Sequence, residues 1–229
     1  MSDMRLKAAQ VSPVTIGEGD LGYVQGTKQG AIYTGDWIEQ AIRAGLGWSI
    51  TVGTMTAGTD ISRVTGGGAG SCMDQDQPEF AVGLSSGWLV PIRIMIDVHG
   101  DIDAADDDAN LLVTVDTAAN GVSTAPTGTA ETAANMLGGA GGSCSANCYS
   151  AITSDITDPT VSEILIARNL WADGSNITVA QLFVDYQPKY PPRYAGPCAI
   201  YGYWGGVAAT HGVARVEFLV LPTSWFPTS

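Results

Sequence analysis

The sequence predicts an all-β fold, a single jelly roll or two-sheet β-sandwich of about eight strands with one or two short helices and long glycine-rich loops. Three observations favour this fold: many runs alternate with a period of two, β-branched and aromatic residues fill these runs, and Gly, Pro, Asn and Asp bound them. A chain of 229 residues is enough for one such domain. We expect an N-terminal extension over 1–30, the domain over 31–222 and a C-terminal tail over 223–229.

The first predicted element is a helix in the stretch GDWIEQAIRAGLG. Asp36 and Glu39 have the spacing of a capping box, and apolar residues recur on one helical face. Gly45 and Gly47 then end the helical pattern.

After this helix the pattern changes to that of β-strands. We expect strands at WSITVGTMT (48–56), GWLVPIRIMIDVHG (87–100), NLLVTVD (110–116), NITVAQLFVDYQP (176–188), CAIYGYW (198–204) and VARVEFLVL (213–221), with weaker runs at AIYT (31–34) and EFAVGL (79–84).

The stretch 157–175 fits either a helix or a strand. Asp158 followed by Pro159 is a good helix opening, and Val161 and Ile164 have helical spacing. The run EILIARN would also suit a strand, and we predict the helix.

The last two runs, 198–204 and 213–221, predict a hairpin. Alternation places Tyr201 and Tyr203 on one face and Trp204 on the other, so both faces carry apolar bulk. Such a strand lies either within a core or against a neighbouring subunit. The candidate subunit contacts are Tyr201, Tyr203, Trp204, Trp225 and Phe226.

The charge of the chain is one-sided, with 23 acidic and 10 basic residues and a formal net charge of −13. Because Lys and Arg are not clustered, direct binding of nucleic acid through its phosphates is not expected. An acidic surface suits concentrated salt, where a Debye length of about 3 Å at 1 M screens self-repulsion; an ordinary acidic protein is the alternative. Charged residues make up 14% of the chain, against about 25% in typical domains, which favours a surface covered by neighbours in an assembly.

The N-terminus shows no signal-peptide pattern, and no window reaches the ~18–20 apolar residues of a membrane span. We therefore expect a soluble protein, or one released by lysis or within a particle.

The four cysteines lie mostly in glycine-rich loops. The loops GGGAGSC and GGAGGSC end at Cys72 and Cys144. The disulfide candidates are Cys72, Cys144, Cys148 and Cys198, and free thiols or a metal site are the alternatives. Four cysteines allow three pairings, which the sequence leaves open.

The acidic run DVHGDIDAADDDAN (97–110) does not fit an EF-hand, so a solvated loop is the main interpretation and no metal site is predicted. The weak ion-binding candidates are Asp101, Asp103, Asp106 and Asp108. Neither His99 nor His211 belongs to a catalytic signature, and no nucleophile elbow or P-loop is present. We expect no catalytic residue, no enzyme activity and no cofactor; an enzyme would have to rely on His99 or His211.

Four features of the sequence together resemble a viral family. They are the β-runs from WSITVGTMT to VARVEFLVL, the excess of Asp over Lys, the missing basic arm and the glycine-rich cysteine loops. They are similar to the major capsid proteins of the single jelly-roll type, with a vertical β-barrel, from icosahedral internal-membrane viruses of halophilic archaea. The resemblance implies an upright barrel in a shell built from copies of this chain and a second related capsid protein. It also implies a place in the virion near an internal membrane, after assembly in the host cytoplasm.

The expected function is therefore that of a structural virion protein that self-assembles, stabilised by high salt and by disulfides. A spike or cement protein would share this composition. A carbohydrate-binding β-sandwich is the other alternative, with its aromatic platform drawn from Trp88, Trp171, Tyr201, Tyr203 and Trp204.

Overall fold

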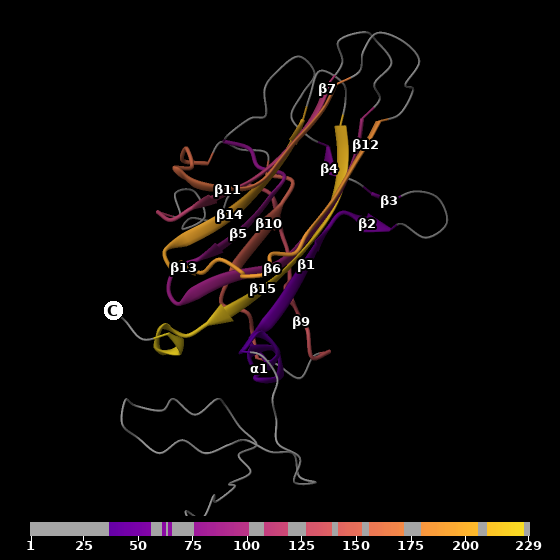
Figure 1. Ribbon diagram of the computed structural model, residues 1–229. Helices are drawn as coiled ribbons and strands as arrows, with labels where there is room; N and C mark the ends of the chain where they lie inside the picture. The colour runs from indigo at the N-terminus through magenta and orange to yellow at the C-terminus, as the bar shows by residue number, and fades with distance from the viewer. Residues whose placement is uncertain are drawn as a thin grey trace, which may run out of the picture.

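The structure is a computed structural model that describes residues 37–55, 61–62, 64–65, 76–100, 108–118, 127–138, 142–152, 156–171, 180–205 and 210–226. Figure 1 shows two sheets of antiparallel strands with α1 at one end. The elements are α1 (Trp37–Arg43), β1 (Gly47–Val52), β2 (Thr54–Met55), β3 (Ile61–Ser62), β4 (Val64–Thr65), β5 (Phe80–Leu84), β6 (Trp88–Gly100), β7 (Asp108–Asp116), β8 (Thr129–Ala130), β9 (Ala134–Asn135), β10 (Asn147–Ser150), β11 (Val161–Trp171), β12 (Ala180–Tyr186), β13 (Tyr194–Ala195), β14 (Cys198–Gly205), β15 (Thr210–Leu221) and the 3₁₀ turn η1 (Thr223–Trp225).

The strand order is that of a jelly roll. The first sheet has the order β12-β6-β15-β1-β9, and the second has the order β11-β7-β14-β5-β10-β8. Among the eight principal strands, β1 pairs with β15, β5 with β14, β6 with β12 and β7 with β11, all antiparallel. The first principal strand thus pairs with the last, the second with the seventh, and so on inward, as in a hairpin rolled into two sheets. The predicted all-β jelly-roll sandwich is confirmed.

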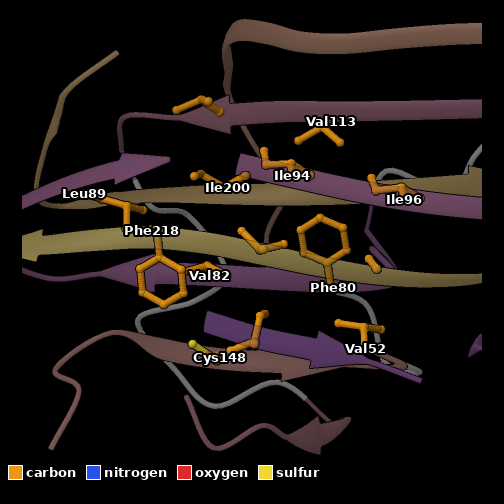
Figure 2. Packing of buried hydrophobic residues seen from close by; sticks show 14 of the residues in the cluster. Val52, Phe80, Val82, Leu89, Ile94, Ile96, Val113, Cys148, Ile200 and Phe218 are labelled. Atoms are coloured by element: carbon orange, nitrogen blue, oxygen red, sulfur yellow. The ribbon is translucent and has the colours of Figure 1, made fainter. Parts of the chain in front are cut away.

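The space between the sheets is filled by apolar side chains. Figure 2 shows Ile94 and Ile96 of the first sheet packed against Phe80, Val113 and Ile200 of the second. These side chains are buried because alternate residues of each strand point inward. The strongly apolar runs in the sequence therefore become the facing surfaces of the sandwich.

Strand β14 is apolar on both faces because it lies between two cores. Ile200 and Trp204 belong to the cluster between the sheets. Tyr201 and Tyr203 belong to a second cluster on the other face, which includes Ile152. Of the two interpretations that the sequence left open, the structure supports burial within a core.

The predicted hairpin of β14 and β15 is wrong. β14 pairs with β5 and β7 in the second sheet, whereas β15 pairs with β1 and β6 in the first. Most consecutive principal strands of this jelly roll change sheets, with β7 and β11 as the exception, and this choice depends on partners far away in the sequence. Local alternation carries no information about such partners.

The stretch 157–175 contains strand β11 and not the predicted helix. β11 pairs with β7 from Val161 opposite Asp116 to Trp171 opposite Asp108, with register shifts between Val161 and Glu163 and between Ile164 and Ile166. Each shift inserts a residue and resets the alternation. The bulged strand therefore shows apolar residues at an irregular spacing that imitates a helix.

The outer face of the first sheet is partly covered by α1 and the C-terminal segment. The helix is confirmed; Ala41 is fully buried on its sheet side, and Gly45 follows it with φ of +80°. The ring of Phe226 packs edge-on against Trp37 and Trp88 at centroid distances of 5.7 and 5.5 Å. The end of the domain is thereby fixed to its beginning.

Most other strand predictions are confirmed, with local differences. The run 48–56 is divided into β1 and β2 at Gly53, whose φ of +88° interrupts the strand. The sequence did not predict the short strand β10. The weak run at 31–34 and the proposed extension over 1–30 lie outside the described residues.

Candidate functional site

Three of the five predicted subunit-contact residues are internal. Tyr201 and Trp204 are fully buried and Tyr203 is 3% exposed. Burial raises the pKa of both tyrosines, so these phenols stay neutral in the folded protein. The main-chain N–H of Trp204 donates to the buried Glu79 carboxylate at 3.1 Å. These aromatics hold the chain's own core together, which corrects their assignment to a subunit wall.

The other two predicted contact residues, Trp225 and Phe226, lie at the surface and pack against their own chain. Both are half-buried in the cluster around α1. The Arg193 guanidinium lies 4.4 Å from the Phe226 ring centroid, which adds a cation–π contact. The aromatic tail thus covers an internal apolar surface.

The described cysteines are free thiols. Cys148 and Cys198 are buried, and Cys144 is half-buried. Desolvation raises the pKa of both Cys148 and Cys198 to about 12, so both stay protonated and unreactive near neutral pH. Cys72 lies outside the described residues, and a disulfide that involves it stays a prediction.

The predicted ion loop falls mostly outside the described part of the chain. Asp101, Asp103 and Asp106 are not described, and Asp108 begins β7. Within the described ranges, no group of three or more His, Cys, Asp or Glu side chains is arranged to hold a metal. His99 and His211, far apart in the sequence, are direct register partners on β6 and β15, which sequence reasoning did not reveal.

Among the side chains that the structure describes, the largest exposed apolar ones on principal strands mark one side of the sandwich. β11 and β12 are the edge strands of the two sheets on this side, and they contact each other. They expose Val161 (48%), Ile164 (56%) and Phe183 (63%). We call β11 and β12 with these three residues the free-edge surface. On the opposite side, each sheet ends in a two-residue strand, β8 or β9.

The free-edge surface is held in shape by polar contacts. The hydroxyl of Tyr194 donates to the Glu163 carboxylate at 2.7 Å, which connects β13 of the first sheet to β11 of the second. Arg93 donates to both carboxylate oxygens of Asp185, at 2.9 and 2.7 Å. This hydrogen bonding lowers the pKa of Asp185 and keeps it ionised. Apolar residues beside fixed polar groups are typical of a protein–protein interface with an apolar centre and a polar rim.

Long edge strands offer unpaired backbone groups to another chain. Within the described ranges, β11 pairs only with β7, and β12 only with β6. The bulges of β11 disturb its first half, which limits simple strand addition there and favours side-chain contacts. The free-edge surface can therefore bind another protein through apolar side chains and, beyond the bulges, through backbone hydrogen bonds.

No helix among the described residues is long and apolar enough to cross a membrane. Comparison of the chain with protein-family models, with curated proteins and with solved structures finds no match.

Proposed function

We propose that this protein is a structural subunit that assembles into a viral capsid. The observation that carries the proposal is the strand order, in which eight principal strands pair first with last to form a jelly roll. Viral capsid domains, lectin domains and cupins use this architecture. Because one fold hosts several functions, the choice among them rests on the surfaces and the interior.

The interior favours a structural role. A binding or catalytic jelly roll needs a hollow or a cluster of convergent polar groups. Here Trp204, Phe80 and Phe218 fill the space between the sheets together with aliphatic side chains. Side chains fill the space between the two sheets, which suits a protein that acts through contacts on its surface.

The arrangement of the aromatics weakens the case for a carbohydrate-binding module. Such a module stacks sugars on exposed rings, yet Tyr201, Tyr203 and Trp204 are buried and Trp88 packs against Phe226. Of the proposed platform only Trp171 is left, and its side chain lies outside the described residues. Assembly through the free-edge surface uses residues that are exposed.

In the proposed assembly, neighbouring subunits bury the free-edge surface. Burial of its apolar area contributes roughly 25 cal/mol per Å². The net charge of −13 opposes association in dilute salt, and molar salt screens this repulsion. The partners are copies of this chain and a second related capsid protein, in a shell next to an internal membrane.

The test is sedimentation with electron microscopy of the full chain, in molar salt and after dilution. We expect particles in molar salt that dissociate as the salt is diluted. Ile164→Asp should abolish assembly and leave the circular dichroism spectrum unchanged. Leu137→Asp is the matched control, because Leu137 is an exposed apolar residue (39%) beyond β9 on the opposite side.

Two results would contradict the proposal. One is a chain that sediments as a monomer in molar salt when it is purified alone and that is absent from the particle fraction of its source culture. The other is assembly of Ile164→Asp with the same salt dependence as the wild type, which would place the contacts elsewhere than the free-edge surface.

A further inference from the structure

The second half of β11 is a regular strand at a free edge. Within the described ranges β11 pairs only with β7, and its two register shifts both lie before Ile166. Residues 166–171 then follow one register with 108–113, without a bulge. A regular edge strand offers unpaired backbone groups to a strand of another chain. On the opposite side of the sandwich the sheets end in β8 and β9, which have only two residues each. The half of β11 beyond the bulges therefore needs a different protection against strand addition.

The sequence of this part of β11 is typical of strands that aggregate. The run ILIARNLW (164–171) is mostly apolar, contains neither Gly nor Pro, and has Arg168 as its one charged residue. Short segments with high β-propensity, low net charge and no Pro form intermolecular β-structure when they are exposed at an edge. Without Arg168, eight consecutive residues of this edge strand would be uncharged.

The register of β11 places Arg168 on the inner face of its sheet. Its register partner Leu111 is fully buried in the cluster between the two sheets. Ile166, two residues earlier on β11, belongs to the same cluster. Register partners share a face, and so do residues two apart on one strand. Arg168 thus points to the inner side of the sandwich, yet it is exposed because β11 is the edge.

The Arg168 side chain folds back along its own strand. Its Nη1 donates to the main-chain oxygen of Ala167 at 3.1 Å, so the guanidinium occupies a backbone acceptor of β11. Ala167, Arg168 and Asn169 are all exposed. A strand that paired with this edge would cover the inner face at Arg168 and remove its charge from water. Because burial of a charge without a partner is unfavourable, Arg168 opposes such pairing.

We propose that Arg168 protects the free edge of the second sheet against the addition of a strand from another copy of this chain. The bulges protect the first half of β11, and the inward-pointing charge protects the second half. An added strand presents a new edge in its turn, so growth by strand addition continues without closure. Arg168 therefore limits the contacts of the free-edge surface to side chains. This inference does not depend on the capsid function, because it rests on the register and exposure of β11 alone.

The experiment compares the full wild-type chain with Arg168→Val, at equal concentration and in salt in which circular dichroism shows both to be folded. Thioflavin T fluorescence and electron microscopy follow the growth of fibres. We expect Arg168→Val to form thioflavin-positive fibres at least about tenfold faster than the wild type. The substitution removes one positive charge and changes the net charge from −13 to −14. Since the added repulsion opposes association, faster growth would not result from the change in net charge.

Three further variants separate the inward charge from other causes. Arg168→Lys and Arg168→Glu both keep a charge at the edge and should remain as free of fibres as the wild type. Lys189→Val makes the same change in net charge and adds the same apolar side chain, but at an exposed position between β12 and β13. It should also behave as the wild type does.

Amide hydrogen exchange locates the contact in the fibres of Arg168→Val. Amides within 166–171 should exchange more slowly in the fibres than in the soluble variant, because the new strand pairs with them. The proposal is wrong if Arg168→Val forms fibres no faster than the wild type, or if Arg168→Glu or Lys189→Val forms them as fast as Arg168→Val. It is also wrong if exchange within 166–171 is unchanged in the fibres, since the contact would then lie elsewhere.

Discussion

At the scale of single residues, two glycines make room for the largest rings of the core. A Cβ built on Gly202 would lie 1.9 Å from Cε1 of Phe80, its register partner on β5. A Cβ on Gly212 would lie 2.7 Å from Cε2 of Trp204. Glycine ordinarily weakens a strand, and here it marks places where an aromatic ring lies directly on a backbone.

We predict that Gly202→Ala lowers the free energy of unfolding by about 1–3 kcal/mol or more, because the Phe80 ring must leave its place in a close-packed core. Urea denaturation measures the change. Gly142→Ala is the control, since a Cβ there meets no atom within 4 Å, and its effect should stay within about 0.5 kcal/mol. Equal effects of the two substitutions would show that the ring packing at Gly202 is looser than described.

At the scale of elements, one buried carboxylate connects the end of β7 to the start of β11. Asp116 is fully buried. Its Oδ1 accepts the amide N–H of Ala118 at 2.7 Å, and its Oδ2 accepts that of Thr160 at 3.2 Å. Thr160 directly precedes β11, so this side chain sets where the edge strand begins.

We predict that Asp116→Ala lowers the free energy of unfolding by about 2–4 kcal/mol, because two hydrogen bonds to a buried carboxylate are lost and two amides lose their acceptor. Amide hydrogen exchange at Ala118 and Thr160 should accelerate. Asp185→Ala is the control. It removes a carboxylate from an exposed ion pair, which water and salt already screen, and it should have a much smaller effect. The hypothesis fails if exchange at Thr160 is unchanged in Asp116→Ala.

The bulged strand β11 also shows why element types could be predicted only in part. β6 and β15 pair with a single register shift, between Glu217 and Phe218, and the sequence predicted these two strands and β7 close to their observed bounds. In β11 the local pattern was ambiguous, and pairing with β7 decided the outcome. Two register shifts between Val161 and Ile166 leave too little regular alternation to identify this strand from local sequence.

At the scale of the whole molecule, several ionisable groups are buried in their neutral form. Desolvation raises the pKa of Cys148 and Cys198 to about 12, and it also raises the pKa of Tyr201 and Tyr203. In the unfolded chain a thiol has a pKa of about 8.5. Above that pH the unfolded state binds fewer protons than the folded state, so stability decreases as the pH rises towards 12.

We predict that, above about pH 8, the free energy of unfolding falls by the order of 1–2 kcal/mol per buried thiol by pH 10. Urea denaturation at pH 8 and pH 10 measures this loss. Cys198→Ala should be less stable at pH 8 because of the lost packing, yet it should lose less stability between the two pH values. A wild-type stability that does not change between pH 8 and pH 10 would show that these thiols are accessible to water when the protein is folded.

The candidate surfaces could be predicted less well than the fold, for a physical reason. The sequence correctly marked the aromatics of β14 as buried on both faces, but it could not tell a core from a subunit contact, since both bury apolar area. It gave no sign of the free-edge surface, because a strand becomes an edge only through its place in the sheet. The register of His99 with His211 likewise follows from pairing over a long sequence distance.

The sequence by itself determined the all-β class, the positions of most strands, the net negative charge and the low proportion of charged residues. These follow from local alternation, turn residues and composition, which need no knowledge of partners. Only the tertiary structure decided that most consecutive principal strands change sheets, that 161–171 is an edge strand and that the aromatics of β14 are internal. Strand pairing and burial depend on residues far apart in the chain, and a local pattern specifies which face is apolar without specifying what covers it.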